Sequence, residues 1–160
     1  MIKFFSGSFL NHKAHEKHKG IHKEMQTTKQ YIDELSRQIL SAAIEVNKTL
    51  KAGLLESLYE KCFIHELSLR GLSCKSQCSV PINYKGLEAE GVLRLDVIVE
   101  DSVIVELKTV EGILPIHKSV VLSYMQMLQK PKGMIFNFNC VNLFREGFVS
   151  LVNDHYAKLF

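Results

Sequence analysis

Three charged side chains stand close together in the middle of the chain, in an order that suits metal and phosphate chemistry. Asp96 is followed ten residues later by Glu106, and Lys108 comes two positions after that. Carboxylate oxygens are the hard ligands that Mg²⁺ and Mn²⁺ prefer, and a lysine ammonium can offset the charge of an anion. Brought together, these groups could bind a divalent cation beside an anionic substrate.

The stretch that carries these side chains, Arg94 to Lys108, has the pattern of a β-hairpin. Two alternating runs rich in β-branched residues flank a polar break at Glu100-Asp101-Ser102, which is typical of two strands and a short turn. A three-residue loop would pair Val99 with Val103. One face of the hairpin is then wholly apolar and consists of Leu95, Val97, Val99, Val103, Val105 and Leu107.

In that register, like charges oppose each other on the second face. Asp96 lies opposite Glu106, with the two Cβ atoms roughly 4.5–5.5 Å apart. Arg94 lies opposite Lys108. Directly opposed like charges destabilise a sheet, so the arrangement favours a divalent cation between the carboxylates. The alternative is a sheet face whose charges are solvated by water.

The composition indicates one globular domain that is close to neutral. The chain has 160 residues, 46% of them apolar, and a formal net charge of +3. Residues 1–29 contain six lysines and two glutamates, a net charge of +4. The remaining residues carry 14 basic and 15 acidic side chains, a net charge of −1. The domain therefore lacks the strong basic field that would by itself indicate a nucleic-acid partner.

Several features favour a cytoplasmic protein that is not embedded in a membrane. No apolar run approaches the roughly 20 residues of a membrane helix, and the first ten residues are too short and interrupted for a good signal peptide. The four cysteines, Cys62, Cys74, Cys78 and Cys140, are irregularly spaced, which favours reduced thiols over disulfides. Cys74 and Cys78 could be zinc ligands, but no second pair completes a site.

We expect a disordered tail over residues 1–30, one domain over 31–153 and a fraying C-terminus over 154–160. The tail is rich in His, Lys and Glu and has little to bury. Its histidines could bind a metal, with a solvated polar tract as the alternative. Either Met1 or Met25 could be the start of the chain.

Hydrophobic periodicity predicts the elements around the hairpin. Helices are expected over 31–50, 54–70, 116–128 and 141–152, and strands over 74–84 and 134–138. In the helix over 54–70, the predicted apolar face includes Leu55, Leu58 and Leu69. Glu56 lies on the flank of that face and Glu66 within it. Carboxylates in such places need a partner or a metal, although the helix dipole alone could stabilise Glu56.

This order of elements resembles the PD-(D/E)XK nuclease superfamily, with Glu56 on a helix and Asp96, Glu106 and Lys108 on the hairpin. The segment Gly53-Leu-Leu-Glu56-Ser-Leu-Tyr59 is similar to the signature of the GxxExxY family within that superfamily. The resemblance extends from about Ile32 to Asn153. It includes the segments Ala42–Val46, Arg94–Asp96, Val105–Lys108, Pro115–His117 and Ile135–Asn139.

The resemblance implies an α/β fold of the restriction-endonuclease-like type, with a central mixed sheet flanked by helices. It implies a metal-dependent nuclease that acts on nucleic acid, with DNA preferred. Asp96, Glu106 and the carbonyl of Leu107 would hold Mg²⁺ or Mn²⁺, and Glu56 would complete the metal site. Lys108 would orient the attacking water or stabilise charge at the scissile phosphate.

Two departures from the family pattern leave alternatives open. No proline precedes Asp96, and Val120 stands where many relatives carry a glutamine on the third helix. One alternative is a binding module with the same fold and no turnover. Another is a subunit that depends on a protein partner, or on a second copy of the chain, for its affinity for nucleic acid.

Overall fold

The computed structural model describes residues 27–160, with the exception of the side chains of residues 89–92. Most of the predicted tail, with its histidines and Met25, lies outside the described residues. In chain order the elements are α1 (Lys29–Leu50), α2 (Glu56–Leu69), β1 (Cys74–Tyr84), β2 (Leu87–Val99), β3 (Val103–Lys108), α3 (Pro115–Met127), β4 (Lys132–Asn137), α4 (Leu143–Glu146), β5 (Phe148–Val152) and α5 (Asp154–Ala157).

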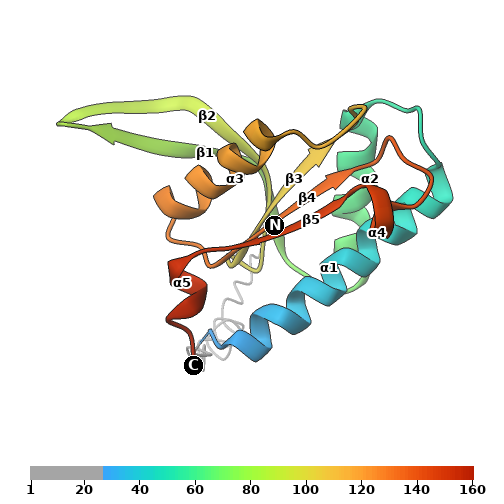
Figure 1. Ribbon diagram of the computed structural model, residues 1–160, viewed down its shortest axis with the longest axis horizontal. Coiled ribbons are helices and arrows are strands. Elements are labelled where there is room, and N and C mark those ends of the chain that lie inside the picture. Colours follow the sequence, from blue (N-terminus) through green and yellow to red (C-terminus); the bar gives the residue numbers. More distant parts are fainter. Residues whose placement is uncertain (1–26) are drawn as a thin grey trace, which may run out of the picture.

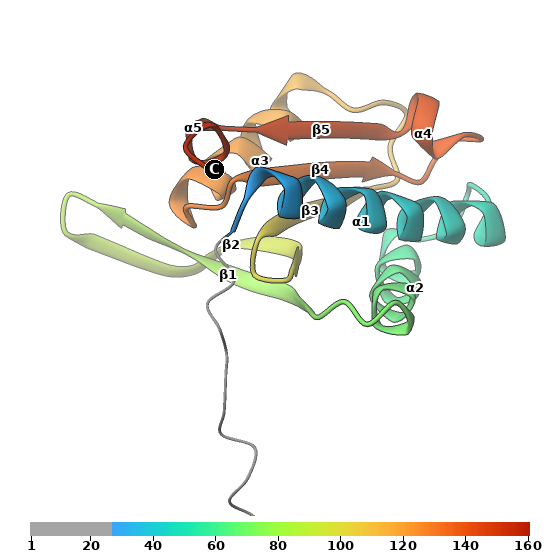
Figure 2. The same cartoon turned by 90° about the horizontal axis from the view of Figure 1, so that it is seen from below.

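The strands form a mixed five-stranded sheet in the order β1-β2-β3-β4-β5. Only β3 and β4 are parallel among the described strands, and the chain passes between them through α3. Helices α1 and α2 pack on one face of the sheet and α3 packs on the other (Figures 1 and 2). The predicted α/β fold, a central mixed sheet flanked by helices as in restriction endonucleases, is confirmed.

Each face of the sheet has its own apolar core. The first core contains the inward stripe of α1, which matches the predicted periodicity: Ile32, Leu35, Ile39, Ala42, Ala43 and Val46. The second core joins Val121, Tyr124 and Met125 of α3 to the opposite face of β2, β3 and β4. Within the described residues no helix is long and apolar enough to span a membrane.

Helix α2 buries a narrower face than its sequence predicts. Only Tyr59, Phe63 and Leu67, which are spaced four residues apart, are fully buried, while Cys62 and Ile64 beside them pack partly buried against the first core. Leu55 and Leu69, which we expected on the buried face, are 76% and 69% exposed. Leu58 is also exposed, and Glu66 forms an ion pair with Arg70, with Oε1 and Nε 2.8 Å apart.

The helix predicted over 141–152 is wrong. The chain there forms only the short helix α4 and then the strand β5, which pairs antiparallel with β4. Val149 and Leu151 pack on the second core, while Phe148 packs on the first. This is the alternation of a strand that has a core on each side. The domain boundaries at 31 and 153 stay a prediction, although α5 follows β5 within residues 154–160.

Gly147, between α4 and β5, is placed where a side chain does not fit. A Cβ atom at this position would lie 2.3 Å from the backbone oxygen of Asn137. The same two residues are joined by a hydrogen bond from the Asn137 N–H to the Gly147 carbonyl, 2.7 Å long. The backbone at Gly147 therefore cannot move away from Asn137 without breaking this hydrogen bond.

We expect Gly147→Ala to lower the free energy of unfolding by about 2–3 kcal/mol, the cost of forcing a methyl group into a packed site. Urea unfolding at neutral pH is the measurement. Gly112→Ala is the matched control, because a Cβ atom there meets nothing within 4 Å, and it should change stability by less than about 0.5 kcal/mol. Equal stabilities of the two variants would contradict the inference that a side chain does not fit at position 147.

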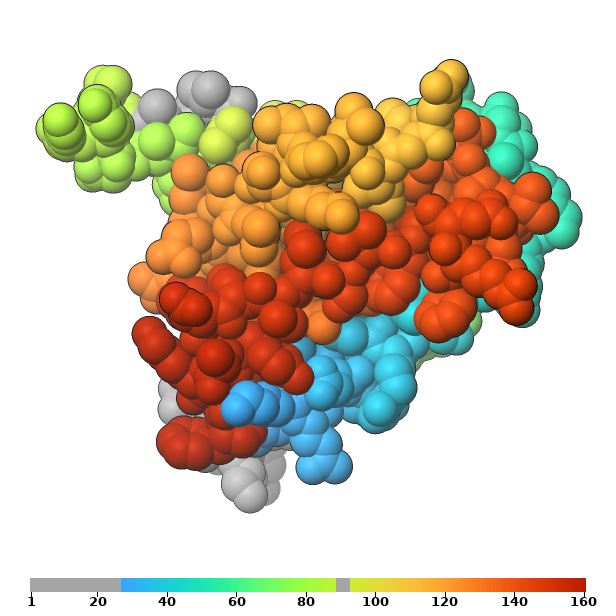
Figure 3. Space-filling model, viewed as in Figure 1, coloured from blue at the N-terminus to red at the C-terminus, as the bar shows by residue number. Residues whose placement is uncertain are grey.

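The β1–β2 hairpin projects from the body of the molecule (Figure 3) as a two-stranded arm (Figure 1). Near its tip Tyr84 and Leu87 are 63% and 66% exposed. Asp96, one of the candidate site residues, lies at the base of this arm, where β2 joins β3 in the sheet.

Candidate metal and phosphate site

Both strands of the arm change the face that they present at the level of Asp96. On β2, Val97 and Val99 pack in the first core, whereas Leu95 packs in the second core. On β1, Gln77 has a left-handed backbone with φ of 53°, and the ladder pairs on either side of it skip Gln77 and Asp96. The expectation that Leu95 shares a face with Val97 is therefore wrong, because an irregularity at this level interrupts the alternation.

The hairpin has the predicted register, but its ladder stops one pair before the charged residues. Val99 pairs with Val103, and the last recorded pair is Val97 with Val105. Asp96 does not continue the ladder through its backbone. Instead, its Oδ2 atom accepts a hydrogen bond of 2.8 Å from the N–H of Leu107. This bond holds the Asp96 carboxylate of β2 against the backbone of β3.

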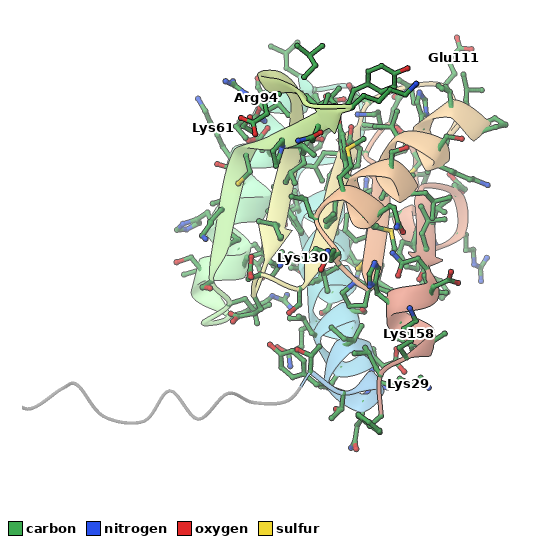
Figure 4. The ribbon with its side chains drawn as sticks, turned by 90° about the vertical axis from the view of Figure 1, so that its left-hand side faces the viewer. Lys29, Lys61, Arg94, Glu111, Lys130 and Lys158 are labelled. Carbon is green, nitrogen blue, oxygen red and sulfur yellow. The ribbon has the colours of Figure 1, made fainter. Side chains whose placement is uncertain are left out.

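The expected opposition of Arg94 and Lys108 does not occur, since the ladder between β2 and β3 ends at Val97 and Val105. Arg94 pairs instead with Ser79 on the β1 side of β2. Arg94 is exposed on the side of the molecule that Figure 4 faces, where Lys61 of α2 is also labelled.

Glu106 is the most unusual polar group of the site. It is only 8% exposed, and it lies on β3 among apolar neighbours. Its Oε1 atom accepts a hydrogen bond from Lys108 Nζ at 2.7 Å, while its Oε2 atom is buried without a partner in the described part of the chain. Burial, and then the charge of Asp96, raise the pKa of the Glu106 carboxyl.

Lys108 ends β3 and bridges two oxygen atoms of that strand. Besides Glu106, its Nζ atom donates to the carbonyl of Leu107 at 2.8 Å. Burial opposes the charged form of Lys108, but the hydrogen bond and the charge of Glu106 outweigh this effect and raise its pKa. The ammonium group lies on the atoms for which a metal-ligand role was predicted.

Glu56 begins α2 near these groups, and its charge contributes to the raised pKa values of Glu106 and Lys108. The loop before it is held by Tyr59, whose hydroxyl donates to the Lys51 carbonyl and accepts from the Leu54 N–H. The Tyr59 ring stacks on Phe138, with ring centroids 4.6 Å apart. Gly53 takes a left-handed φ of 99° in the same loop, which a residue without a Cβ atom adopts at little cost.

Three further polar residues border the site and were not singled out as site residues from the sequence. Glu60 accepts a hydrogen bond of 2.8 Å from Gln77, and burial raises its pKa. Tyr124 of α3 donates to the Arg94 carbonyl at 3.4 Å, and burial, followed by the charge of Glu106, raises its pKa. Glu60 follows Glu56 by one helical turn, so helical spacing could have indicated it; nothing in the sequence indicates the backbone conformation of Gln77.

The donor set fits a hard divalent cation. Carboxylates and a backbone carbonyl are the oxygen ligands that Mg²⁺ and Mn²⁺ accept, and the unpartnered Oε2 atom of Glu106 is a buried acceptor that a cation would satisfy. As the side chains stand, no three His, Cys, Asp or Glu residues of the described chain converge on one point. The Lys108 ammonium group instead contacts two of the proposed ligand groups, the Glu106 carboxylate and the Leu107 carbonyl.

Two other features of the molecule are separate from this site. Cys74 packs against the first core and Cys78 against the second, so these two thiols do not form a zinc pair. A cavity of about 510 Å³ lies beside the β2–β3 turn, where Tyr31, Asp101 and Lys130 are among its lining residues. That turn is at the opposite end of β3 from Lys108.

Comparison with known proteins gives one match. A family model described as the PD-(D/E)XK nuclease superfamily matches residues 33–149, which include all the candidate site residues. No curated protein and no solved structure matches the chain.

Proposed function

Because the chain belongs to the PD-(D/E)XK nuclease superfamily, we propose that it is a metal-dependent nuclease of the GxxExxY family that hydrolyses phosphodiester bonds in DNA. The observation that carries this proposal is the buried Oε2 atom of Glu106, which has no partner in the described structure. An acceptor left in this way is costly, and a metal ligand is the role that would explain it.

In this proposal Asp96, Glu106 and the carbonyl of Leu107 hold Mg²⁺ or Mn²⁺, and Glu56 completes the site. When bound, the metal supplies an activated water molecule and offsets charge on the phosphate oxygens. The chain's own groups keep this site in place. The Leu107 N–H fixes the Asp96 carboxylate at 2.8 Å, and Lys108 supplies a cation for charge that develops on the phosphate.

The geometry around Glu56 supports the assignment to the GxxExxY family. Gly53 allows the left-handed turn before the helix, and Tyr59 ties that turn through two hydrogen bonds. The three signature positions therefore have distinct tasks. The glycine and the tyrosine shape the loop, and the glutamate at the start of α2 projects from it.

A second candidate function is a binding subunit without turnover, either alone or with a protein partner. It is favoured by Val120, which packs its apolar side chain against the second core and offers no polar contact from α3. The nearly neutral charge of residues 30–160 also favours a partner that would supply affinity for nucleic acid.

The deciding experiment is a single-turnover assay of the full chain on labelled double- and single-stranded DNA and RNA, with Mg²⁺ or Mn²⁺. We expect cleavage of DNA that a chelator abolishes. Binding that weakens with salt, but without cleavage of any of the four substrates under either metal, would instead support the binding subunit.

A second test concerns the metal alone. An ion that binds only the folded state raises its stability, by about 2.7 kcal/mol at one hundred times the dissociation constant, so Mn²⁺ should raise the melting temperature by several degrees. Asp96→Asn should lose much of this increase. Asp154→Asn, an exposed change in α5, should keep it. The same increase in Asp96→Asn as in the unchanged protein would exclude Asp96 as a ligand.

A further inference from the structure

The position of the Lys108 ammonium has a consequence for how the site is loaded. Its Nζ atom lies 2.7 Å from Glu106 Oε1 and 2.8 Å from the Leu107 carbonyl. Both residues are among the ligands of the proposed metal site. We propose that Lys108 and the divalent cation compete for the Glu106 carboxylate and the Leu107 carbonyl, so that metal binding releases Lys108 from Glu106 and frees it to contact the phosphate. This inference rests on the proposed function.

Competition follows from the distances and the charges. A divalent ion held by the Glu106 carboxylate and the Leu107 carbonyl would place its charge beside the ammonium group, which contacts the same two groups. Two cations on one carboxylate group repel each other strongly in a partly buried site. The lysine is therefore an internal counter-ion for Glu106, and the metal replaces it.

The Lys108 side chain can leave Glu106 by turning toward solvent. Lys108 is the last residue of β3, and its side chain is 18% exposed, compared with 11% for that of Glu106. The strand itself stays in place, because the Lys108 carbonyl accepts from the Phe138 N–H at 2.8 Å and Asn137 binds both backbone groups of Val110. Only the flexible side chain has to turn toward solvent.

The released ammonium then needs another anion. A phosphate group of the substrate, next to the metal, supplies one. Metal binding and the placement of Lys108 would thus be coupled, and the lysine would exchange its ion pair with Glu106 for a contact with the phosphate. The rival possibility is that Lys108 stays on Glu106 throughout and has only a structural role.

The test compares melting temperatures of the full chain and of Lys108→Met, each with a chelator and with saturating Mn²⁺. With the chelator, the variant should melt at least about 5 °C lower, because Glu106 loses the partner of its buried charge. With Mn²⁺ this difference should fall to less than half. Calorimetry should show Mn²⁺ binding at least about fivefold tighter to the variant, as linkage between folding and binding requires.

Lys118→Met controls for the loss of one positive charge, since Lys118 is an exposed residue of α3. Its melting temperature should differ from that of the unchanged protein equally with and without Mn²⁺. Lys108→Gln, which can still donate a hydrogen bond to Glu106, provides the same calorimetric comparison if the methionine variant does not fold.

The outcomes separate this inference from the proposed function. If Mn²⁺ stabilises the unchanged protein but the deficit of Lys108→Met is the same with and without the ion, the lysine does not move and the inference is wrong, while the metal site stands. If Mn²⁺ neither binds nor stabilises any of these proteins, both are wrong.

Discussion

Glu106→Gln should lower the single-turnover rate of DNA cleavage by at least about a hundredfold, the scale at which loss of one preorganised electrostatic group is felt. The amide has nearly the shape of the carboxylate, but it is a poor ligand for a hard cation. The rate is measured at saturating protein with Mg²⁺ on a labelled duplex. A rate within about twofold of the unchanged protein would remove Glu106 from the metal site.

This variant should still fold. Burial already raises the pKa of the Glu106 carboxyl, which means that the surroundings accept a neutral side chain more readily than a charged one. The amide oxygen can also accept a hydrogen bond from Lys108. Glu45→Gln, on the exposed side of α1, is the matched control and should cleave at the unchanged rate.

Lys108→Met should also lower the single-turnover rate by about a hundredfold, for a different reason. Here the ion still binds, and it binds more tightly than before, but the cation that faces the phosphate is gone. The deficit must therefore persist at saturating Mn²⁺, with Lys118→Met cleaving at the unchanged rate. Equal rates of Lys108→Met and the unchanged protein would show that Lys108 takes no part in the chemistry.

The hairpin was predictable because its pattern is local. Alternation on both sides of one polar break fixes the pairing of Val99 with Val103, and the structure has that pair. The bounds of α1, α2, β1 and α3 lie within two residues of the expected ones, since each of these elements begins or ends at a clear signal such as Gly53, Gly71 or Pro115.

The change of face at Asp96 was not predictable, because its causes are not local. It depends on a left-handed residue in β1, Gln77, at the level of Asp96 in the neighbouring strand. The same limit explains the error over 141–152. Phe148 and Val149 favour a strand by propensity, but the partner that makes them one, the free edge of β4, lies outside the segment.

The candidate site was predicted in its residue types and only partly in its contacts. Asp96 reaches the backbone of β3 through the Leu107 N–H rather than by direct opposition to Glu106. The bridge from Lys108 to the Leu107 carbonyl depends on a side-chain rotamer, which no strand pattern specifies. The role of Tyr59 depends on a loop conformation that becomes visible only when its hydrogen bonds are known.

The start of α1 and the last residue of the chain lie at one corner of the described structure. The N–H of Lys29, the first residue of α1, donates to the carbonyl of Phe160 at 2.9 Å, and Figure 1 shows the C-terminus beside the start of that helix. Ends that meet in this way make a domain portable. Residues 29–160 have the geometry of a cassette that could be spliced into a surface loop of a host protein, or closed into a circular permutant opened at the exposed turn between β1 and β2.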